Sequence, residues 1–569
     1  MIQILCKNDG KYYKVKPGSS LLELSRKVCT ETTDPKTGAR YPVLAALVDH
    51  KLKELGFSLF YPHEVEFIGY NHPDGKRSYI RSLCFMLQHA VRTLFPDRVL
   101  VIDHSLPSGL YCELQDPFGE EGGSPRRYRL QPEELRALRE RMQALAEEDL
   151  PFTSEKIPSV EAQALFLAQN QPCKADLHRS LGRYFCRVYH LGDQVDSFHG
   201  PLVISTGQLK VFDLMRFHDG FCLQYPSEDD ISRPIPRRPQ TKLAATLKDY
   251  SQWCTTTGIV GIGTLNKTLL EGGAVPLINL CEARQERKYA EVADQVWAER
   301  DRVKIVFIAG PSSSGKTSSS LRLAQQCRVL GMNPKVIELD NYFVPREQTP
   351  VDEDGNFDFE SLGAMNLDLL GCHLNALLQG DRVELPRFDF KSGVPVFEGN
   401  YMQLKDNDIL IMEGIHALDP AMVPSVDPER IFRVYASALT SLNVDENNNI
   451  STTDNRLLRR IVRDNRTRGV SPEQTILRWP SVRRGENKYI FPFQENADVQ
   501  FNSALLYELP LLKYYAEPLL RRIHPSSPAY SEAVRLLKFL DYIVALQPSE
   551  ISAVPPTSIL REFIGGQRL

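Results

Sequence analysis

Through the second half of the chain, apolar runs of strand length alternate with stretches of helical periodicity. Residues 303–309 form an apolar run, and residues 334–339 and 408–412 are two further predicted strands; each of the three is followed at once by glycine or by an acidic residue. Residues 318–330 carry apolar positions at helical spacing, and a mostly charged helical stretch, residues 277–302, leads into the first run. This alternation predicts a parallel sheet with helices on its faces.

The first 65 residues show the pattern of a small α/β unit. A first strand leads into the turn Lys16-Pro17-Gly18, and a helix is predicted over residues 21–28. Apolar runs at residues 45–48 and 65–68 predict two further strands.

From about residue 70 to residue 225 the pattern changes. We expect a helix over residues 81–94, a strand over 99–102 and an amphipathic helix over 132–148. Residues 233–239 hold three prolines and several basic residues, which is typical of a linker.

Composition narrows the class of protein. A chain of 569 residues is too long for one core, so three or more domains are expected. A hydrophobic content of 42%, 25% charged residues and a net charge of −4 are ordinary for a soluble globular protein and give no general reason to expect nucleic-acid or membrane binding. The eleven cysteines are scattered without C-x-x-C, so neither a zinc site nor a disulfide framework is indicated. An odd cysteine count without an export signal predicts the cytoplasm.

Residues 310–317 read Gly-Pro-Ser-Ser-Ser-Gly-Lys-Thr, a complete G-x-x-x-x-G-K-[ST] loop between a predicted strand and a predicted helix. In such a turn, backbone N–H groups and the positive end of the helix dipole form an anion site. Lys316 reaches the β- and γ-phosphate oxygens, and the Thr317 hydroxyl is placed to ligate Mg²⁺. The strand and helix around the loop disfavour a chance Gly/Ser-rich turn. The pattern predicts binding of a nucleoside triphosphate by Gly310, Ser312, Ser313, Ser314, Gly315, Lys316, Thr317 and Ser318.

Two carboxylates follow neighbouring predicted strands. Asp340 ends the second strand, where a carboxylate can accept a proton from a substrate hydroxyl that attacks the γ-phosphate. Glu413 ends the third strand, a position suited to holding Mg²⁺. Ligands of open parallel sheets bind beyond the carboxyl ends of the strands, so we expect both residues at one site.

Six arginines crowd one predicted helix and its end. They are Arg456, Arg459, Arg460, Arg463, Arg466 and Arg468. Alone they would indicate a solvated helix face. With a phosphate loop upstream, a lid that closes on the transferring phosphoryl group is favoured.

With these motifs in order, residues 303 to about 500 resemble the uridine/cytidine kinase and phosphoribulokinase family of P-loop kinases. The matching segments are residues 310–317, 339–343, 356–358, 385–390, 412–415, 456–464 and 468–469. The resemblance implies ATP and Mg²⁺ as cofactors and Asp340 as the general base. It implies catalytic roles for Lys316, Arg460 and Arg463, nucleotide contact by Arg468, substrate contacts by Asp340, Asp358, Phe388, Asp389 and Arg460, and Mg²⁺ ligation by Thr317 and Glu413.

The departures from the family fall in the acceptor pocket. Phe388 and Phe343 stand where the family has tyrosines, Gly393 where it has a base-reading histidine, and Val470 where it has a lid arginine. A pocket without its polar readers loses discrimination between substrates. Because Asp358, which holds the ribose hydroxyls in the family, is present, a nucleoside is the favoured acceptor, and another polyol or sugar-like acceptor is the alternative.

The first half of the chain resembles threonyl-tRNA synthetases. Residues 1 to about 68 resemble their ubiquitin-like TGS domain, through residues 15–20, 45–49 and 65–68. Residues 70 to about 225 resemble their editing domain, through residues 109–111, 139–147 and 212–215.

The editing motifs themselves are degenerate. Where the family has H-x-x-x-H, residues 85–89 keep only His89, and residues 198–202 lack both polar groups of C-x-x-x-H. A lone histidine on an apolar helix is more often a core residue than a catalyst. We therefore expect a non-editing module that serves binding, regulation or assembly.

The sequence thus predicts a multidomain α/β and α+β protein. The expected parts are a TGS-like domain (1–68), a degenerate editing-like α+β domain (69–225), a linker with connecting helices (226–302), a P-loop parallel-sheet kinase domain (303–530) and a C-terminal helix with a loosely specified tail (531–569).

The predicted activity is transfer of the γ-phosphate of ATP to a hydroxyl of a small molecule. A rival hypothesis is an RNA-associated regulatory ATPase, which the negative net charge disfavours. A third hypothesis is a kinase whose N-terminal half senses an amino acid. We expect no membrane partner. The pattern leaves open a homo-oligomer, the ligand of the N-terminal half, and whether Arg483 and Arg484 face phosphates or form a surface basic pair.

Overall fold

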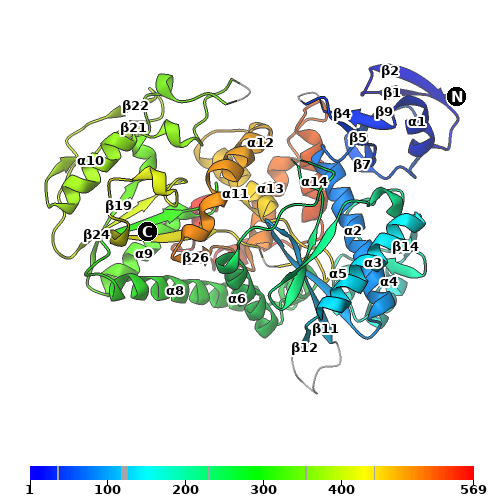
Figure 1. The fold of residues 1–569 in the computed structure, drawn as a ribbon, viewed down its shortest axis with the longest axis horizontal. Coiled ribbons are helices and arrows are strands. Elements are labelled where there is room, and N and C mark those ends of the chain that lie inside the picture. The colour runs from blue at the N-terminus through cyan, green and yellow to red at the C-terminus, as the bar shows by residue number, and fades with distance from the viewer. Residues whose placement is uncertain (35–36, 117–125, 229, 353–354, 441) are drawn as a thin grey trace.

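The computed structural model of the chain describes residues 1–34, 37–116, 126–228, 230–352, 355–440 and 442–569. Figure 1 shows the N-terminal half on one side and a parallel-sheet part on the other. Between them lie three helices, α11 (Thr452–Thr467), α13 (Glu508–Leu520) and α14 (Tyr530–Leu540).

The first residues form a five-stranded sheet with one helix. Its strand order is β2 (Lys11–Val15), β1 (Ile2–Cys6), β9 (His63–Ile68), β6 (Ala45–Val48) and β7 (Lys51–Lys53). The β1–β9 pair is parallel and the other pairs are antiparallel. The helix predicted over residues 21–28 is α1 (Leu21–Val28), which the Ser20 side chain caps by accepting from the Glu23 N–H.

A second region, whose sheets are antiparallel, follows. Its main sheet has the order β10 (Val99–Leu106), β11 (Gly109–Asp116), β17 (Gly220–Gln224), β16 (Asp213–Phe217), with β12 (Arg126–Tyr128) beside β11. A smaller sheet joins β13 (Thr153–Pro158), β14 (Phe185–Leu191) and β15 (Gln194–Asp196). The helices are α2 (Pro73–Leu94), α3 (Pro132–Glu148), α4 (Ser159–Ala168) and α5 (Pro172–Ser180), and α3 has the predicted bounds.

The start predicted for α2 was wrong by eight residues. The helix begins at Pro73 rather than near Arg81, because the His72 ring accepts from the Asp74 N–H and proline suits the first helical turn. Gly75 is a close-packing position, since a Cβ there would lie 1.9 Å from the Gly69 carbonyl oxygen.

The parallel sheet predicted for the second half is present. Its order is β19 (Asn333–Glu338), β24 (Asp408–Glu413), β18 (Ile305–Ala309), β25 (Ile431–Ser437) and β26 (Val499–Asn502), and all four pairings are parallel. Helix α9 (Lys316–Val329) follows β18, and α10 (Leu367–Leu378) and α12 (Pro472–Tyr489) lie farther along the chain. Two short hairpins, β20 (Val383–Glu384) with β23 (Tyr401–Met402) and β21 (Arg387–Asp389) with β22 (Val394–Val396), precede β24.

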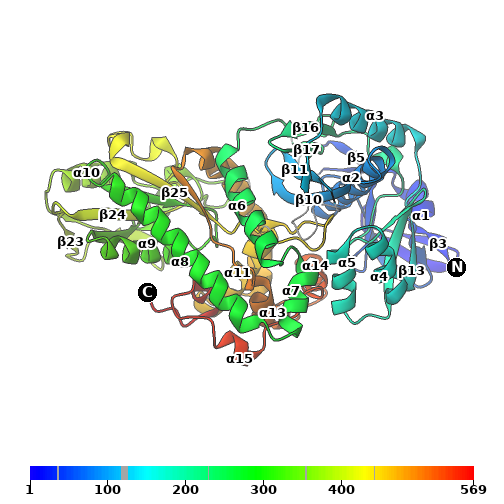
Figure 2. The same cartoon turned by 90° about the horizontal axis from the view of Figure 1, so that it is seen from below.

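Three helices lead from the N-terminal half to this sheet. They are α6 (Thr241–Thr257), α7 (Ile262–Leu270) and α8 (Ala274–Ala298), and residues 233–239 before them have neither helix nor strand, as predicted. Helix α8 ends four residues before the predicted end, and Figure 2 shows it running along the parallel-sheet part.

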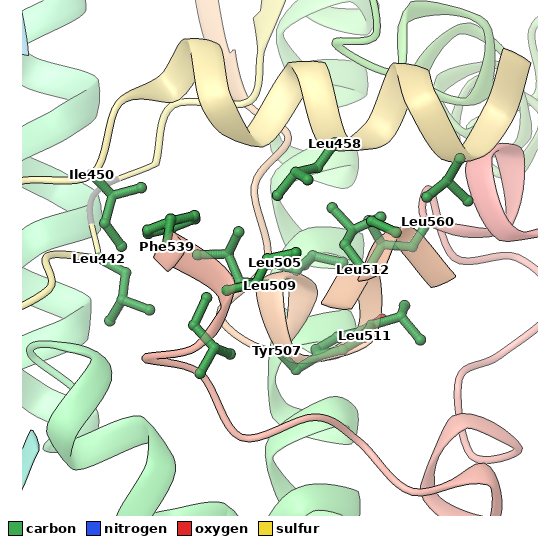
Figure 3. Packing of buried hydrophobic residues seen from close by; sticks show 14 of the residues in the cluster. Leu442, Ile450, Leu458, Leu505, Tyr507, Leu509, Leu511, Leu512, Phe539 and Leu560 are labelled. Carbon is green, nitrogen blue, oxygen red and sulfur yellow. The ribbon is translucent and has the colours of Figure 1, made fainter. Parts of the chain in front are cut away.

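The largest buried cluster joins α6, α7 and α8 to α11, α13 and α14. Figure 3 shows Leu458 of α11 above Leu509 and Leu512 of α13, with Phe539 of α14 and Leu560 of the last segment packed around them. The prediction of a loosely specified tail was therefore wrong. The short helices α15 (Pro548–Ile551) and α16 (Arg561–Ile564) belong to this segment, whose apolar residues are buried.

Two smaller expectations bear on the class of protein. The eleven cysteines are free thiols, and all but Cys29 and Cys372 are buried. Across the ranges that the structure describes, no helix is both long and apolar enough to span a bilayer.

Candidate functional site

The phosphate loop joins β18 to α9 in the turn that its glycines permit. Gly315 has φ +84° and caps α9, and a Cβ at Gly310 would lie 1.9 Å from the Ala436 carbonyl oxygen of β25. Ser313 also adopts a positive φ of 60°. The loop therefore turns tightly against the sheet and brings its N–H groups to the start of α9.

Three consecutive carbonyl groups of this loop accept hydrogen bonds from side chains of later segments of the chain. The Ser312 oxygen accepts from Arg456 at 3.1 Å, and the Ser313 oxygen from Arg459 at 3.3 Å. The Ser314 oxygen accepts from the Ser503 hydroxyl at 2.6 Å. These three hydrogen bonds fix the backbone of the loop from Ser312 to Ser314.

The two arginines behind the loop are themselves buried in ion pairs. Arg456 forms a bidentate pair with Glu486 of α12, and Arg459 one with Glu508 of α13. All four side chains are at most 2% exposed. The expectation that this arginine-rich helix is a closing lid is therefore not met for Arg456 and Arg459, because α11 is packed in the largest core cluster.

The other predicted arginines converge on one carboxylate. Arg460, Arg463 and Arg468 all lie within ion-pair distance of Asp464. Arg460 also donates to the Ser312 hydroxyl at 2.8 Å, which brings it to the phosphate loop. Arg466 instead donates to backbone oxygens of Glu562 and Phe563 in the last segment.

Two carboxylates accept hydrogen bonds from groups that could otherwise bind an anion. Glu486 accepts from the Ser312 N–H at 2.9 Å. Glu562 accepts from the Ser318 hydroxyl at 2.6 Å and, at 3.4 Å, from the Ser318 N–H. The Gln567 side chain also donates to the Ser318 hydroxyl. The last segment of the chain, in which sequence reasoning found no chemistry, thus lies against the start of α9.

The predicted metal ligands are adjacent. The Thr317 hydroxyl donates to Glu413 at 2.7 Å. Burial raises the pKa of Glu413 to about 7, and the neighbouring Asp340 adds to the rise. A hydroxyl and a carboxylate are oxygen donors of the kind Mg²⁺ takes beside phosphate and water, so these residues fit the ion.

Asp340 follows β19 in a 3₁₀ turn at the carboxyl edge of the sheet. Desolvation raises its pKa, whereas Lys316 and Arg468 oppose the rise. The side chain reaches solvent, so this desolvation is partial.

Glu360 is a further carboxylate at this place, and sequence reasoning missed it. Burial raises its pKa to about 7, Glu486 adds to the rise, and Arg460, Lys316 and Asp340 also act on it. A Cβ on Gly485 would lie 2.5 Å from the Glu360 Cβ, so glycine at 485 makes room for it. In the sequence, the one indication of a role for Glu360 was its position two residues after Asp358.

The fold brings some of the predicted acceptor residues into contact with one another. Phe388 is buried and packs edge-on against Phe343, with ring centroids 5.6 Å apart. Asp358 accepts from the Tyr489 hydroxyl at 3.3 Å. Asp389 accepts from the Lys391 N–H and the Ser392 hydroxyl of its own turn, which lowers its pKa.

The glycine that replaces the base-reading histidine lies beside a cation. A Cβ on Gly393 would lie 2.9 Å from side-chain atoms of Arg346, whose guanidinium donates to the Phe390 carbonyl. Arg346 is thus a polar group near the predicted acceptor pocket that the motif comparison did not reveal.

In the editing-like region, His89 is a buried core residue. It is 7% exposed, and the Thr93 side chain contacts its ring and its carbonyl oxygen. Arg81, two turns earlier on α2, instead lines a large cavity between the two halves of the chain.

Comparison with known proteins finds different relatives for the two halves of the chain. Residues 305–506 match the model of the Phosphoribulokinase / Uridine kinase family. The N-terminal region matches threonine–tRNA ligases, with 29% identity over 218 residues for Desulforamulus reducens and 32% over 181 residues for Acidithiobacillus ferrooxidans. These matches cover 38% and 32% of the chain but only 31% and 27% of the ligases' own length.

Solved structures give weaker likenesses. A possible uridine kinase from Bacillus stearothermophilus is 18% identical with a TM-score of 0.26, covering 38% of this chain and 98% of that one. A D-glycerate 3-kinase from Cryptococcus neoformans is 12% identical with a TM-score of 0.21, covering 50% and 90%. Both TM-scores are below 0.5, so nothing about function follows from them.

Replacing Glu508 by Gln removes the carboxylate that faces Arg459 in the core. The guanidinium then stays buried without a counter-charge, so we expect the free energy of unfolding to fall by about 3–5 kcal/mol. Chemical unfolding at pH 7 measures this. The control Glu517→Gln breaks the more exposed pair with Arg521 and is expected to change stability by less than about 1 kcal/mol. Equal losses in the two variants would contradict the role assigned to the buried pair.

Replacing Glu360 by Gln tests the raised pKa. Because folding favours the protonated carboxyl, its stabilising contribution is full below pH 4.5 and is lost as the pH rises toward 7. The Gln variant should match the wild type near pH 4.5 and exceed it at pH 8 by about 1–2 kcal/mol, a value reduced for the partial exposure of the side chain. Thermal unfolding of both proteins across this range is the measurement. A difference that does not vary with pH would refute it.

Proposed function

We propose that the chain is an ATP-dependent small-molecule kinase that transfers the γ-phosphate to a hydroxyl of a nucleoside-like acceptor. One observation carries the proposal. The phosphate loop, the Thr317–Glu413 pair and Asp340 follow β18, β24 and β19, three neighbouring strands of one parallel sheet, at their carboxyl ends. Ligands of such sheets bind at this edge. The family match over residues 305–506 supports the same reaction class.

Each residue then has a defined task. The loop N–H groups and Lys316 bind the phosphates, and Arg460 at Ser312 adds positive charge where the γ-phosphoryl group transfers. Mg²⁺, held by Thr317 and Glu413, would neutralise phosphate charge. Asp340 orients the acceptor hydroxyl and takes its proton, a role that its raised pKa supports.

Glu486 and Glu562 hold loop atoms that a triphosphate would use. A phosphate group carries more charge and more acceptor oxygens than a carboxylate, so it can displace Glu562, whereas Glu486 stays in its buried pair with Arg456. Nucleotide binding is therefore expected to move the Glu562 segment away from Ser318.

The acceptor site is aromatic. Beside the buried Phe343 and Phe388 lie the exposed rings of Phe357, Phe359 and Phe390. Such rings offer a stacking surface for a flat base without reading its edge. Asp358 is the group proposed to hold the ribose hydroxyls. The alternative acceptor, another polyol or sugar-like compound, would use the same carboxylate without stacking.

Replacing Asp340 by Asn should leave the fold and Mg·ATP binding intact. Because an amide cannot take the acceptor proton, we expect phosphoryl transfer to fall by roughly 10²-fold or more. Single-turnover transfer and nucleotide titration measure the two properties separately. Wild-type turnover in this variant would remove Asp340 from the mechanism.

The direct test is ADP release from the purified protein with Mg·ATP and a panel of nucleosides, sugars and polyols. ADP release that uridine or cytidine stimulates, and that Lys316→Ala loses, would establish a nucleoside as the acceptor. Stimulation by another hydroxyl compound would keep the mechanism and change the substrate. No stimulation by any acceptor, with RNA alone raising turnover, would replace the kinase by a regulatory ATPase.

A further inference from the structure

A cavity of about 830 Å³ lies between the N-terminal half and the helices next to the phosphate loop. Its walls come from α2, from the segment before α11, from the last turns of α12 and from α14. This volume is typical of sites for small molecules. The cavity is lined neither by the phosphate loop nor by Asp340 or Glu413.

The lining is strongly basic. It contains ten lysine and arginine residues but only three aspartates and glutamates. Several of these cations are neutralised at once: Arg535 pairs with Asp454 and Glu532, and Lys76 with Glu228. The remaining excess of cations gives the cavity a positive electrostatic potential, which attracts anions.

Arg81, Arg238 and Lys538 have no ion pair among the described residues, and of these three only Arg81 is buried. Its side chain is buried, one guanidinium nitrogen donates to the Pro201 carbonyl, and the Nε atom is buried without a partner. It forms no ion pair with any residue in the described part of the chain, and burial lowers its pKa to about 10. A buried cation without a counter-charge destabilises a fold unless a ligand supplies the charge.

Other atoms of the cavity favour the same kind of ligand. The Nδ1 atom of His199, on the same wall, is buried without a hydrogen-bond partner. Lys538 of α14 also lines the cavity; its side chain is exposed, and partial desolvation together with nearby lysines lowers its pKa. The first turn of α11, which begins at Thr452, also lines the cavity and directs the positive end of its dipole there.

We propose that this cavity is a binding site for a small phosphorylated molecule, with Arg81 as the central phosphate contact. A phosphate group offers several charged oxygens and carries more charge than a carboxylate, so it can accept from donors on α2 and α14 together. The alternative is a water-filled gap in which Arg81 serves only to hold the Pro201 carbonyl.

The test uses the full-length Lys316→Ala protein, so that the phosphate loop contributes little to anion binding. Inorganic pyrophosphate is the probe, and calorimetric titration is the readout. We expect saturable binding that Arg81→Gln weakens by about tenfold or more, the size of a lost hydrogen bond to a charged group. Arg237→Gln is the matched control, since Arg237 is exposed and lies outside the cavity. It should bind as the parent does.

Thermal unfolding without probe separates a binding role from a structural one. An unpaired buried cation contributes little to stability, so Arg81→Gln should unfold no earlier than the parent. If that variant does not fold, Lys538→Gln is the variant that tests the binding role. We expect it to lower the pyrophosphate affinity by at least about threefold. Absent binding, or binding that neither variant weakens, overturns the proposal. A short RNA that binds through Arg81 when pyrophosphate does not would also overturn it, in favour of an RNA site.

Discussion

Two buried arginine–glutamate pairs fix the phosphate loop, and most of the site depends on them. Arg456 and Arg459 each use one part of the guanidinium for a glutamate and another for a loop carbonyl. In a low-dielectric core the loss of either glutamate would leave an uncompensated charge. The pairs therefore bind α11, α12 and α13 to the loop as one unit.

The same unit is tied to the N-terminal half. The segment before α11 lies along β10, where Asn443 and Asn447 donate to the carbonyls of Ile102 and Leu100. Farther on, Arg535 of α14 forms a bidentate pair with Asp454 in the first turn of α11. The helix that holds the phosphate loop is thus held in turn by residues that line the basic cavity. Any ligand there would contact the same structure that positions the loop.

Much of the fold was predictable, because its signals are local. The loop at residues 310–317, the strands around it and the helices over residues 21–28 and 132–148 follow from periodicity and from the conformations that glycine permits. The meeting of Thr317, Asp340 and Glu413 was also predictable, since neighbouring parallel strands end at one edge. The start of α2 was not, because the close approach of Gly75 to Gly69 is a tertiary contact.

The sequence by itself therefore determined the phosphate loop, the parallel sheet and the positions of the carboxylates at its edge. Only the tertiary structure decided what the arginines do. Periodicity shows that five of the six arginines share a helix and that Arg468 follows it, but it cannot show that Glu486 and Glu508 bury two of them. In the same way, only folding brings Glu562, which lies 244 residues after Ser318, to the loop, and leaves Arg81 without an ion pair among the described residues. Charge partners are chosen in space, by burial and by the desolvation that makes an unpaired ion unfavourable, and sequence spacing does not encode that choice.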